Sequence, residues 1–313
     1  MTGQAGGKPR HFLDLADFST AEIEALLASA KALKARHRKG DLGDYLPLLG
    51  RKIALVFQQP SLRTRMSFDV GINELGAHVL IVSGDEIELG QRESIADTAR
   101  VMSRYVDAIM IRMLSHLELN ELAQYASVPV INGLTKKSHP CQVLADIQTF
   151  EERLGSIRGR TVAWTGDANN VLTSWIHAAA RLDVKLKIAT PEQLAPGREI
   201  LDWAAREKAD LTLTTDPYEA VDAADCVITD CWVSMGDSDR EYRHNLLRPY
   251  QVDSRLMDAA GKDAIFMHCL PAKRGEEVAA EIIDGPRSAV WDEAENRLHA
   301  QKAVLVWALT DPK

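Results

Sequence analysis

The sequence predicts an α/β protein with two domains, each built on a central parallel sheet flanked by helices. Two observations indicate this class. Short apolar runs of strand length alternate with segments of helical period along most of the chain, and polar residues follow the runs where they end. Such alternation is typical of crossover units, whose parallel sheets are covered on both faces. A length of 313 residues suits two domains of ordinary size.

The first half is expected to contain one sheet. Residues 19–22 (Ser-Thr-Ala-Glu) have the pattern of a capping box and open a helix that should end near Arg36. Strand candidates follow at 52–57, 78–82, 108–112 and 128–132. Helices are expected near 64–76, 94–106 and 116–126, and a longer one from about Pro140 to Leu154.

The second half repeats this organisation after the segment 155–160, which contains two glycines and marks the expected domain boundary. We therefore place a first domain at 1–150 and a second at 151–313. Strand candidates in the second domain lie at 161–165, 184–189, 211–214, 226–229 and 264–267. Helices are expected near 170–182, 196–207 and 248–260, and a last helix at about 294–309 is predicted to pack back on the first domain.

Composition argues against several classes of protein. A net charge of −8 argues against nucleic-acid binding, which needs a basic face. No run of ~18 apolar residues is present to span a membrane, and residues 1–10 lack the apolar core of a signal peptide. The four cysteines show no C-x-x-C spacing, so we expect reduced thiols in a cytoplasmic protein rather than a zinc or redox site.

An anion site is predicted directly after the first strand, in the segment Pro60-Ser61-Leu62-Arg63-Thr64-Arg65. The first turn of a helix has free N–H groups and a partial positive charge. Hydroxyl groups and guanidinium forks at such a turn match phosphate oxygens. Because the Walker spacing is missing, a small phosphate compound is favoured over a nucleoside triphosphate. The alternative is a Ser N-cap followed by solvated arginines.

Polar residues also follow the other predicted strands, in both halves of the chain. In parallel sheets ligands bind beyond the carboxyl ends of the strands. The residues at these positions are Arg112, Asn132, His139, Gln142, Asp167, Asn169, Asn170, Asp230, Ser234, His268 and Cys269. Packing could account for any one of these residues, but it accounts less well for polar residues at the carboxyl ends of strands in both halves of the chain. We therefore expect an active-site cleft between the two domains.

Five short motifs in this chain resemble those of the aspartate/ornithine carbamoyltransferase family. Residues 61–65 match its phosphate motif Ser-x-Arg-Thr-Arg, and 139–142 match His-Pro-Cys-Gln. Residues 230–236 match the ornithine-type signature Asp-x-x-x-Ser-Met-Gly, 268–271 match His-Cys-Leu-Pro, and 295–297 match Glu-Asn-Arg. All five occur in family order over nearly the whole chain, and the Ser-Met-Gly segment is typical of the ornithine branch.

The resemblance implies a first domain that binds carbamoyl phosphate and a second that binds L-ornithine, assembled as a homotrimer or a multiple of trimers. The implied reaction is direct attack of the δ-amine of ornithine on the carbamoyl carbon, without a covalent enzyme intermediate. Its products are L-citrulline and phosphate, as in arginine biosynthesis. No metal or organic cofactor is implied.

The resemblance also assigns site residues. Those for carbamoyl phosphate are Ser61, Leu62, Arg63, Thr64, Glu88, Arg112, His139, Gln142, Cys269, Leu270 and Arg297. Those for ornithine are Leu134, Asn170, Asp230, Ser234, Met235 and Cys269. Arg112 and His139 would stabilise the oxyanion catalytically, Cys269 would orient the amine, and Arg297 would reach carbamoyl phosphate. Arg65 is expected to point away, in an ion pair that supports the turn.

Three features qualify the match. Leu62 stands where many members carry Thr; loss of one neutral hydrogen bond costs about 0.5–1.5 kcal/mol, so weaker phosphate binding with intact activity is expected. Glu88 stands where relatives often place Gln or His, on a loop that reaches the neighbouring subunit's phosphate site. If Glu88 points toward the phosphate, it would repel it unless Arg92 lies between them. The alternative is that Glu88 faces solvent. The polar stretch from 237 to about 245 is expected to form a lid over ornithine.

Four alternatives stay open. A transferase for another amine, such as N-acylated ornithine or putrescine, is disfavoured because Asp230 suits a free α-ammonium group. A catabolic enzyme of the arginine-deiminase pathway would share all these residues. A dehydrogenase that uses 166–169 is disfavoured by the missing G-x-G-x-x-G pattern. A non-catalytic relative is disfavoured because the catalytic positions are present.

Overall fold

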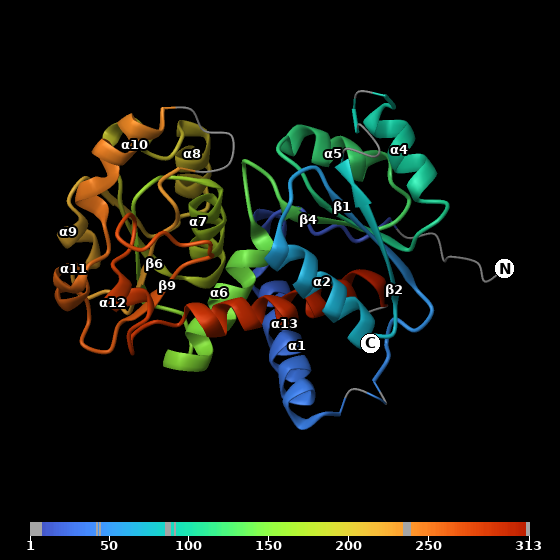
Figure 1. Cartoon of the computed structure of the whole chain (residues 1–313), viewed down its shortest axis with the longest axis horizontal. Helices are drawn as coiled ribbons and strands as arrows, with labels where there is room; N and C mark the ends of the chain where they lie inside the picture. Colours follow the sequence, from blue (N-terminus) through green and yellow to red (C-terminus); the bar gives the residue numbers. More distant parts are fainter. Residues whose placement is uncertain are drawn as a thin grey trace. The chain divides into compact units, whose positions relative to one another are not determined.

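The computed structural model describes residues 8–41, 43, 45–84, 89–90, 92–233 and 239–310, and it divides into two compact units (Figure 1). Unit 1 comprises Met1–Asp17, Ala21–Cys141 and Arg297–Lys313, and unit 2 comprises Phe18–Thr20 and Gln142–Asn296. Besides the short segment Phe18–Thr20, the chain passes from one unit to the other inside two helices, which are α6 (Pro140–Leu154) and α13 (Val290–Leu309). Each unit has its own parallel sheet and helices, which confirms the predicted α/β class. Within the described ranges, none of the helices is long and apolar enough to cross a membrane.

Unit 1 is built on a four-stranded parallel sheet of order β2-β1-β3-β4. The strands are β1 (Lys52–Phe57), β2 (His78–Ser83), β3 (Ala108–Arg112) and β4 (Val130–Leu134). The helices are α1 (Thr20–Lys39), α2 (Leu62–Glu74), α4 (Ile95–Met102) and α5 (His116–Tyr125), with a 3-10 turn η1 (Leu15–Asp17) before them. All four apolar runs are strands as predicted. They were recognisable because β1 and β3 are buried along nearly their whole length, so almost every residue in them is apolar.

A serine begins three of the helices that follow strands of this sheet, namely α2, α4 and α5. The Oγ atoms of Ser61, Ser94 and Ser115 accept hydrogen bonds from the backbone N–H three residues later, at 3.3, 3.1 and 3.2 Å. An N-cap of this kind satisfies one free N–H group of the first turn and contributes about 1 kcal/mol. Ser61 thereby determines where α2 begins after β1.

Unit 2 is built on a five-stranded parallel sheet of order β7-β6-β5-β8-β9. The strands are β5 (Thr161–Thr165), β6 (Lys185–Ala189), β7 (Leu211–Thr214), β8 (Cys226–Ile228) and β9 (Ile265–Met267). The helices are α7 (Asn170–Leu182), α8 (Arg198–Arg206), α9 (Pro217–Val221), α10 (Arg240–Leu247), α11 (Ser254–Ala259) and α12 (Ala280–Ile283), with 3-10 turns η2 (Glu192–Leu194) and η3 (Arg248–Tyr250). The single helix predicted at 248–260 is η3 and α11, which residues 251–253 separate.

The sequence did not reveal α9, α10 or α12. Helices α9 and α12 are too short to show a helical period. Helix α10 lies where we expected a polar lid, and it buries only Leu247. A segment without an apolar stripe has no sequence signal for helix, so the contacts that hold α10 are tertiary.

The same polar contact supports the central strand of each sheet. In unit 1 the carboxylate of Asp107 accepts from Arg51 Nη1 and from Lys52 N, both at 2.8 Å. In unit 2 the carboxylate of Asp225 accepts from Arg160 Nη1 at 2.8 Å and from Thr161 N at 2.9 Å. Each aspartate directly precedes the neighbouring strand. The two sheets therefore begin their central strands in the same way, which agrees with the similarity expected between the two halves.

A cluster of ionisable side chains joins α1, α2 and α13 inside unit 1. Lys302 Nζ lies 2.5 Å from one carboxylate oxygen of Glu74, and His37 Nδ1 lies 3.0 Å from the other. The rings of His37 and His299 meet edge to face with centroids 5.3 Å apart. Burial, together with the positive charges of Lys302 and Lys34, lowers the pKa of His299 to about 3.

This depressed pKa predicts an acid-sensitive unit 1. Below pH 6.5 the unfolded chain protonates His299 but the folded chain does not, so stability falls as pH falls from about 6.5 to about 3, by up to about 1.4 kcal/mol per pH unit. Urea unfolding at about pH 7 and about pH 4.5 measures this. We expect His299→Gln to lose about 2 kcal/mol less than the wild type between these pH values. His78→Gln, at an exposed position, is the control; an equal loss in all three proteins would contradict the prediction.

Candidate active site

The first turn of α2 has the structure predicted for an anion site. Ser61 is the N-cap, and its Oγ accepts from Thr64 N at 3.3 Å and donates to Thr64 Oγ1 at 3.1 Å. Arg297 Nη2, from α13, donates to the same Thr64 Oγ1 at 2.9 Å. Thr64 is fully buried and Arg297 is 3% exposed. Because Thr64 Oγ1 accepts both bonds, its own proton is directed to another acceptor.

Three arginines surround His139 in unit 1. Burial lowers the pKa of His139 well below its usual value, and the charges of Arg297, Arg112 and Arg63, in that order, lower it further. His139 is therefore a neutral imidazole at neutral pH, able to donate one hydrogen bond. Among the described residues, no hydrogen bond or ion pair occupies the side chain of Arg63. A group of cations beside a helix N-terminus, two of which (Arg112 and Arg297) are buried, favours an anion with more than one negative charge.

A bulge in the sheet positions Arg112 at the end of β3. Ile111 pairs with Asn132 but Arg112 pairs with Leu134, so Gly133 is the extra residue. A Cβ atom at Gly133 would lie 2.5 Å from Met110 Sδ and 3.0 Å from Ile111 O, which only glycine avoids. Leu134 lies at this bulge, and its carbonyl accepts from Met113 N at 3.1 Å.

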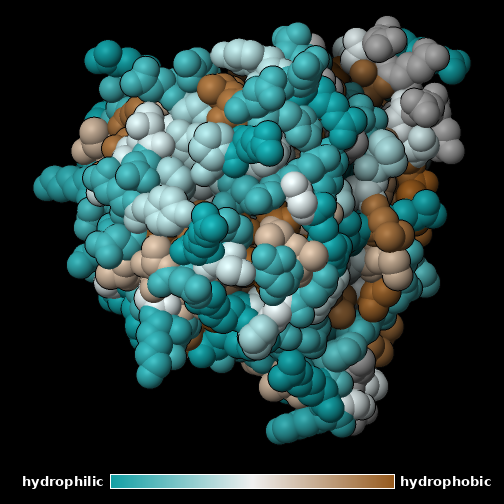
Figure 2. Space-filling model, turned by 60° about the vertical axis from the view of Figure 1, so that its left-hand side comes forward, coloured by the Kyte–Doolittle hydropathy of each residue, from teal (hydrophilic) through white to brown (hydrophobic). Residues whose placement is uncertain are grey.

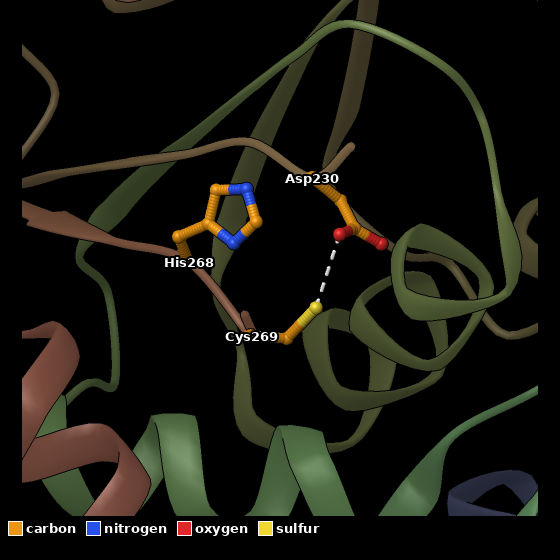
Figure 3. Close-up of side chains that lie close together, drawn as sticks. All are labelled: Asp230, His268 and Cys269. Atoms are coloured by element: carbon orange, nitrogen blue, oxygen red, sulfur yellow. Dashed lines mark hydrogen bonds between the residues drawn. The ribbon is translucent and has the colours of Figure 1, made fainter. Parts of the chain in front are cut away.

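A second polar group gathers at Asp230, after β8 in unit 2. Its Oδ2 accepts from Asn169 Nδ2 at 2.6 Å, and its Oδ1 accepts from Cys231 N at 2.7 Å. Cys269 Sγ donates to the same Oδ1 at 3.1 Å, as the dashed line in Figure 3 shows. Burial and the Asp230 charge raise the pKa of the Cys269 thiol well above its usual value. The thiol is therefore a hydrogen-bond donor and not a thiolate nucleophile.

His268 fixes the turn that carries Cys269. Leu270 N donates to His268 Nδ1 at 2.9 Å, so Nε2 carries the ring proton. That nitrogen lies 3.4 Å from Glu277 Oε1, and both side chains are fully buried. Leu270 has a φ of +59°, a conformation that L-residues adopt rarely and that surrounding contacts must hold.

Asp230, His268 and Cys269 also offer three ligand atoms within 4.8 Å of one another. A metal ion there would need a thiolate at Cys269 and the lone pair of His268. The thiol proton instead bonds to Asp230, and His268 Nδ1 accepts from Leu270 N. The donor set therefore fits a hydrogen-bonded cluster better than a metal centre.

The structure distributes the predicted site residues between the two units. Unit 1 brings together Ser61, Arg63, Thr64, Arg112, His139 and Arg297. Unit 2 brings Asp230 to Cys269 and places Asn170 at the start of α7. Leu62 is 70% exposed, and Leu270 is half-buried. Glu88, Ser234 and Met235 lie outside the described residues.

The structure corrects the expectation for Arg65. Arg65 is exposed, and the ion pair we expected for it is not found among the described residues.

The structure also gives a role to Asn169. Sequence reasoning singled out Asn170 but gave no role to Asn169, whose Oδ1 caps α7 by accepting from Val171 N at 2.9 Å and Leu172 N at 3.2 Å. The N-cap pattern before 170–182 could have indicated the cap, but no local pattern indicates the bond to Asp230.

Two family models match the chain. The carbamoyl-P binding domain of aspartate/ornithine carbamoyltransferase matches residues 10–152, and the Asp/Orn binding domain matches residues 158–308. The chain belongs to the aspartate/ornithine carbamoyltransferase family. The first match contains Ser61, Thr64 and His139, and the second contains Asp230 and Cys269.

Relatives in this family are similar over almost their whole length. The ornithine carbamoyltransferase of Nitrobacter winogradskyi is 60% identical over 301 residues, which are 96% of this chain and 97% of that protein. The solved ornithine carbamoyltransferase from Pyrococcus furiosus is 46% identical with a TM-score of 0.93, covering 98% and 99% of the two chains. The solved anabolic enzyme from Campylobacter jejuni is 38% identical with a TM-score of 0.89, covering 96% and 98%.

Asn169 offers a prediction for this member of the carbamoyltransferase family. Both Ser and Asp can replace Asn as a helix N-cap, but neither can donate an amide N–H to Asp230. We expect Asn169→Ser to raise KM for the amine substrate about tenfold. Asn169→Asp, which faces Asp230 with a second carboxylate, should raise KM further. Steady-state kinetics measures KM and thermal unfolding monitors the cap; wild-type KM in both variants would contradict the prediction.

Proposed function

We propose that this protein is an ornithine carbamoyltransferase, which transfers the carbamoyl group of carbamoyl phosphate to the δ-amine of L-ornithine and releases phosphate. The observation that carries the proposal is the cluster of Arg63, Arg112 and Arg297 around neutral His139 at the start of α2. Its positive charge and its hydroxyl groups suit a small, doubly charged phosphate compound. The second unit adds a buried carboxylate, Asp230, which suits an amine substrate.

Most of the residues that would bind carbamoyl phosphate belong to unit 1, and Gln142 belongs to unit 2. Ser61, Arg63 and Thr64 would hold the phosphate, and Arg63 would neutralise the charge that develops as phosphate leaves. Arg112 and His139 would donate to the carbamoyl oxygen, which becomes an oxyanion when the amine attacks. Arg297, which already donates to Thr64, would stabilise the same anion. Gln142 would bind the carbamoyl group.

Most of the residues that would bind ornithine belong to unit 2, and Leu134 belongs to unit 1. Asp230 would pair with the α-ammonium group, and Asn170 would donate to the α-carboxylate; Leu134, Ser234 and Met235 would complete the site. Cys269, as a protonated thiol held by Asp230, would orient the δ-amine. An alkyl ammonium has a pKa of about 10.4 in water, and burial lowers it.

The step balances without a side-chain base. The δ-nitrogen forms a bond to the carbamoyl carbon, and the bond from that carbon to the phosphate oxygen breaks. The leaving phosphate can accept the proton that the amine loses. We assign 1–150 to carbamoyl phosphate and 151–313 to ornithine, while the C-terminal part of α13 supplies Arg297 to unit 1.

We also propose that the protein is a homotrimer or a multiple of trimers. An exposed apolar stripe on α2 supports association: Leu62 is 70%, Met66 57% and Val70 43% exposed, at helical spacing. Leu80 and Ile81 are exposed on the edge strand β2, and hydrophobic surface is visible along the right-hand edge of Figure 2. Apolar patches of this kind mark interfaces. Light scattering should give a trimer for the wild type and smaller species for Met66→Glu; a monomeric wild type would refute the trimer.

We place the enzyme in arginine biosynthesis and in the cytoplasm. The Campylobacter jejuni structure is named anabolic, which supports the first assignment. All four cysteines are free thiols, which suits a reducing compartment.

The test is citrulline formation by the purified protein from carbamoyl phosphate. L-ornithine, N-acetyl-L-ornithine, putrescine and L-aspartate are offered in parallel, and Arg297→Leu controls for a contaminating enzyme. Turnover with L-ornithine alone is the expected result. Turnover with another amine would retain carbamoyl transfer and overturn the choice of acceptor. No turnover with any amine would overturn the proposal.

A further inference from the structure

Gln142 is held by two buried carboxylates in unit 2. Its Nε2 donates to Asp146 Oδ1 at 2.8 Å and to Glu293 Oε1 at 2.9 Å. All three side chains are 1% exposed. Both amide hydrogens are therefore used, and the orientation of the amide is defined, because only its NH₂ group can face two carboxylate oxygens.

The two carboxylates are themselves held in place. Trp175 Nε1 donates to the second oxygen of Asp146 at 3.1 Å. The backbone N–H of His268 donates to the second oxygen of Glu293 at 2.9 Å. Neither carboxylate can rotate without losing a bond, and a flipped amide would place its oxygen against both of them. The network therefore fixes the direction in which Gln142 Oε1 points.

Gln142 Oε1 is buried and accepts no hydrogen bond from the described part of the chain. An unsatisfied buried carbonyl is costly, so native structures rarely keep one without a role. Gln142 follows His139 by three residues at the start of α6, and residues at this spacing share a face of a helix. Gln142, which carries the free acceptor, and His139 thus lie on the same face at the start of this helix.

We propose that Asp146 and Glu293 are positioning residues, which hold Gln142 so that its Oε1 accepts an N–H from the carbamoyl nitrogen. This inference rests on the proposed function. Carbamoyl phosphate carries an NH₂ group where acetyl phosphate carries a methyl group of similar size. Only the first can satisfy the buried acceptor, and a site with such an acceptor rejects the analogue that lacks the donor. The network therefore makes the site selective for carbamoyl over acyl phosphates.

The test compares two affinities in the same protein. Titration calorimetry gives Kd for carbamoyl phosphate, and competition gives Ki for acetyl phosphate, in the wild type, Asp146→Asn and Glu293→Gln. Asp292→Asn is the matched control, because this neighbouring acid pairs with Arg153 on the surface instead. We expect the wild type and the control to prefer carbamoyl phosphate. Each test variant should weaken carbamoyl phosphate about tenfold and leave acetyl phosphate within about twofold.

The outcomes separate the possibilities. A loss of both affinities in proportion would mean that the carboxylates only support the fold, and it would overturn the inference. Equal affinity for the two phosphates in the wild type would overturn it as well. If both test variants fail to fold, Trp175→Phe, which removes one bond to Asp146, replaces them. This variant should partially reduce the preference for carbamoyl phosphate over acetyl phosphate, and an unchanged preference would overturn the inference. A wild type that binds no carbamoyl phosphate would refute the proposed function itself.

Discussion

Arg297→Leu is expected to lower kcat/KM for carbamoyl phosphate about 10³-fold, because removal of one preorganised donor from a developing anion costs about 10²–10³ in rate and this arginine also contributes to binding. Arg297 is 3% exposed and donates to Thr64 Oγ1, so Leu removes a charge and leaves that hydroxyl oxygen with one donor fewer. Steady-state kinetics at fixed ornithine measures the effect. Arg100→Leu, an exposed arginine of α4, should retain wild-type kinetics.

The same variant has a second readout. Burial lowers the pKa of His139 most, and among the charged groups Arg297 lowers it most. Loss of Arg297 should therefore raise the pKa of His139. An NMR titration of labelled histidine detects this rise. The variant should therefore lose residual activity at a higher pH than the wild type when the medium is acidified, since protonated His139 disturbs the site. A variant with kcat/KM within about threefold of the wild type would remove Arg297 from the site that we propose.

Asp230→Asn is expected to raise KM for ornithine about 10²–10³-fold, because loss of one partner of a buried charge pair costs about 3–4 kcal/mol. Asn is close to isosteric with Asp, so a change in shape does not explain such a loss. Binding of carbamoyl phosphate, which we assign to unit 1, should stay within about twofold of the wild type. Kinetics with ornithine and calorimetry with carbamoyl phosphate measure the two effects separately.

A matched control lies at the other end of the same strand. Asp225 precedes β8 and Asp230 follows it, and both accept two or more hydrogen bonds. Asp225→Asn should reduce stability and leave KM for ornithine unchanged. Asp230→Asn should also lower the pKa of the Cys269 thiol, since the Asp230 charge raises it in the wild type. Faster alkylation of Cys269 would report this change, whereas equal KM values in the two variants would contradict the role of Asp230.

The strands of both sheets were predictable because burial on two faces makes them almost wholly apolar. The start of α2 was predictable as well, since Ser61 signals a cap and the arginines after it signal an anion. The run at 128–132 was misplaced by two residues relative to β4, because the bulge at Gly133 extends the strand into a polar segment. Helix α10 was missed because its position depends on Arg243, whose Nε donates to Trp232 O at 2.8 Å and whose Nη2 pairs with Asp167 at 2.5 Å.

The sequence alone determined the fold class, the family and the residues that carry charge or hydroxyl groups, because these depend on local periodicity and short motifs. Only the tertiary structure decided which polar groups meet. Asn169 bonds to Asp230 across 61 residues, Gln142 to Glu293 across 151, and Arg297 to Thr64 across 233. No local pattern encodes such pairs, since their geometry results from packing of segments that are far apart in the chain. The same packing buries His139 among arginines and thereby makes it neutral.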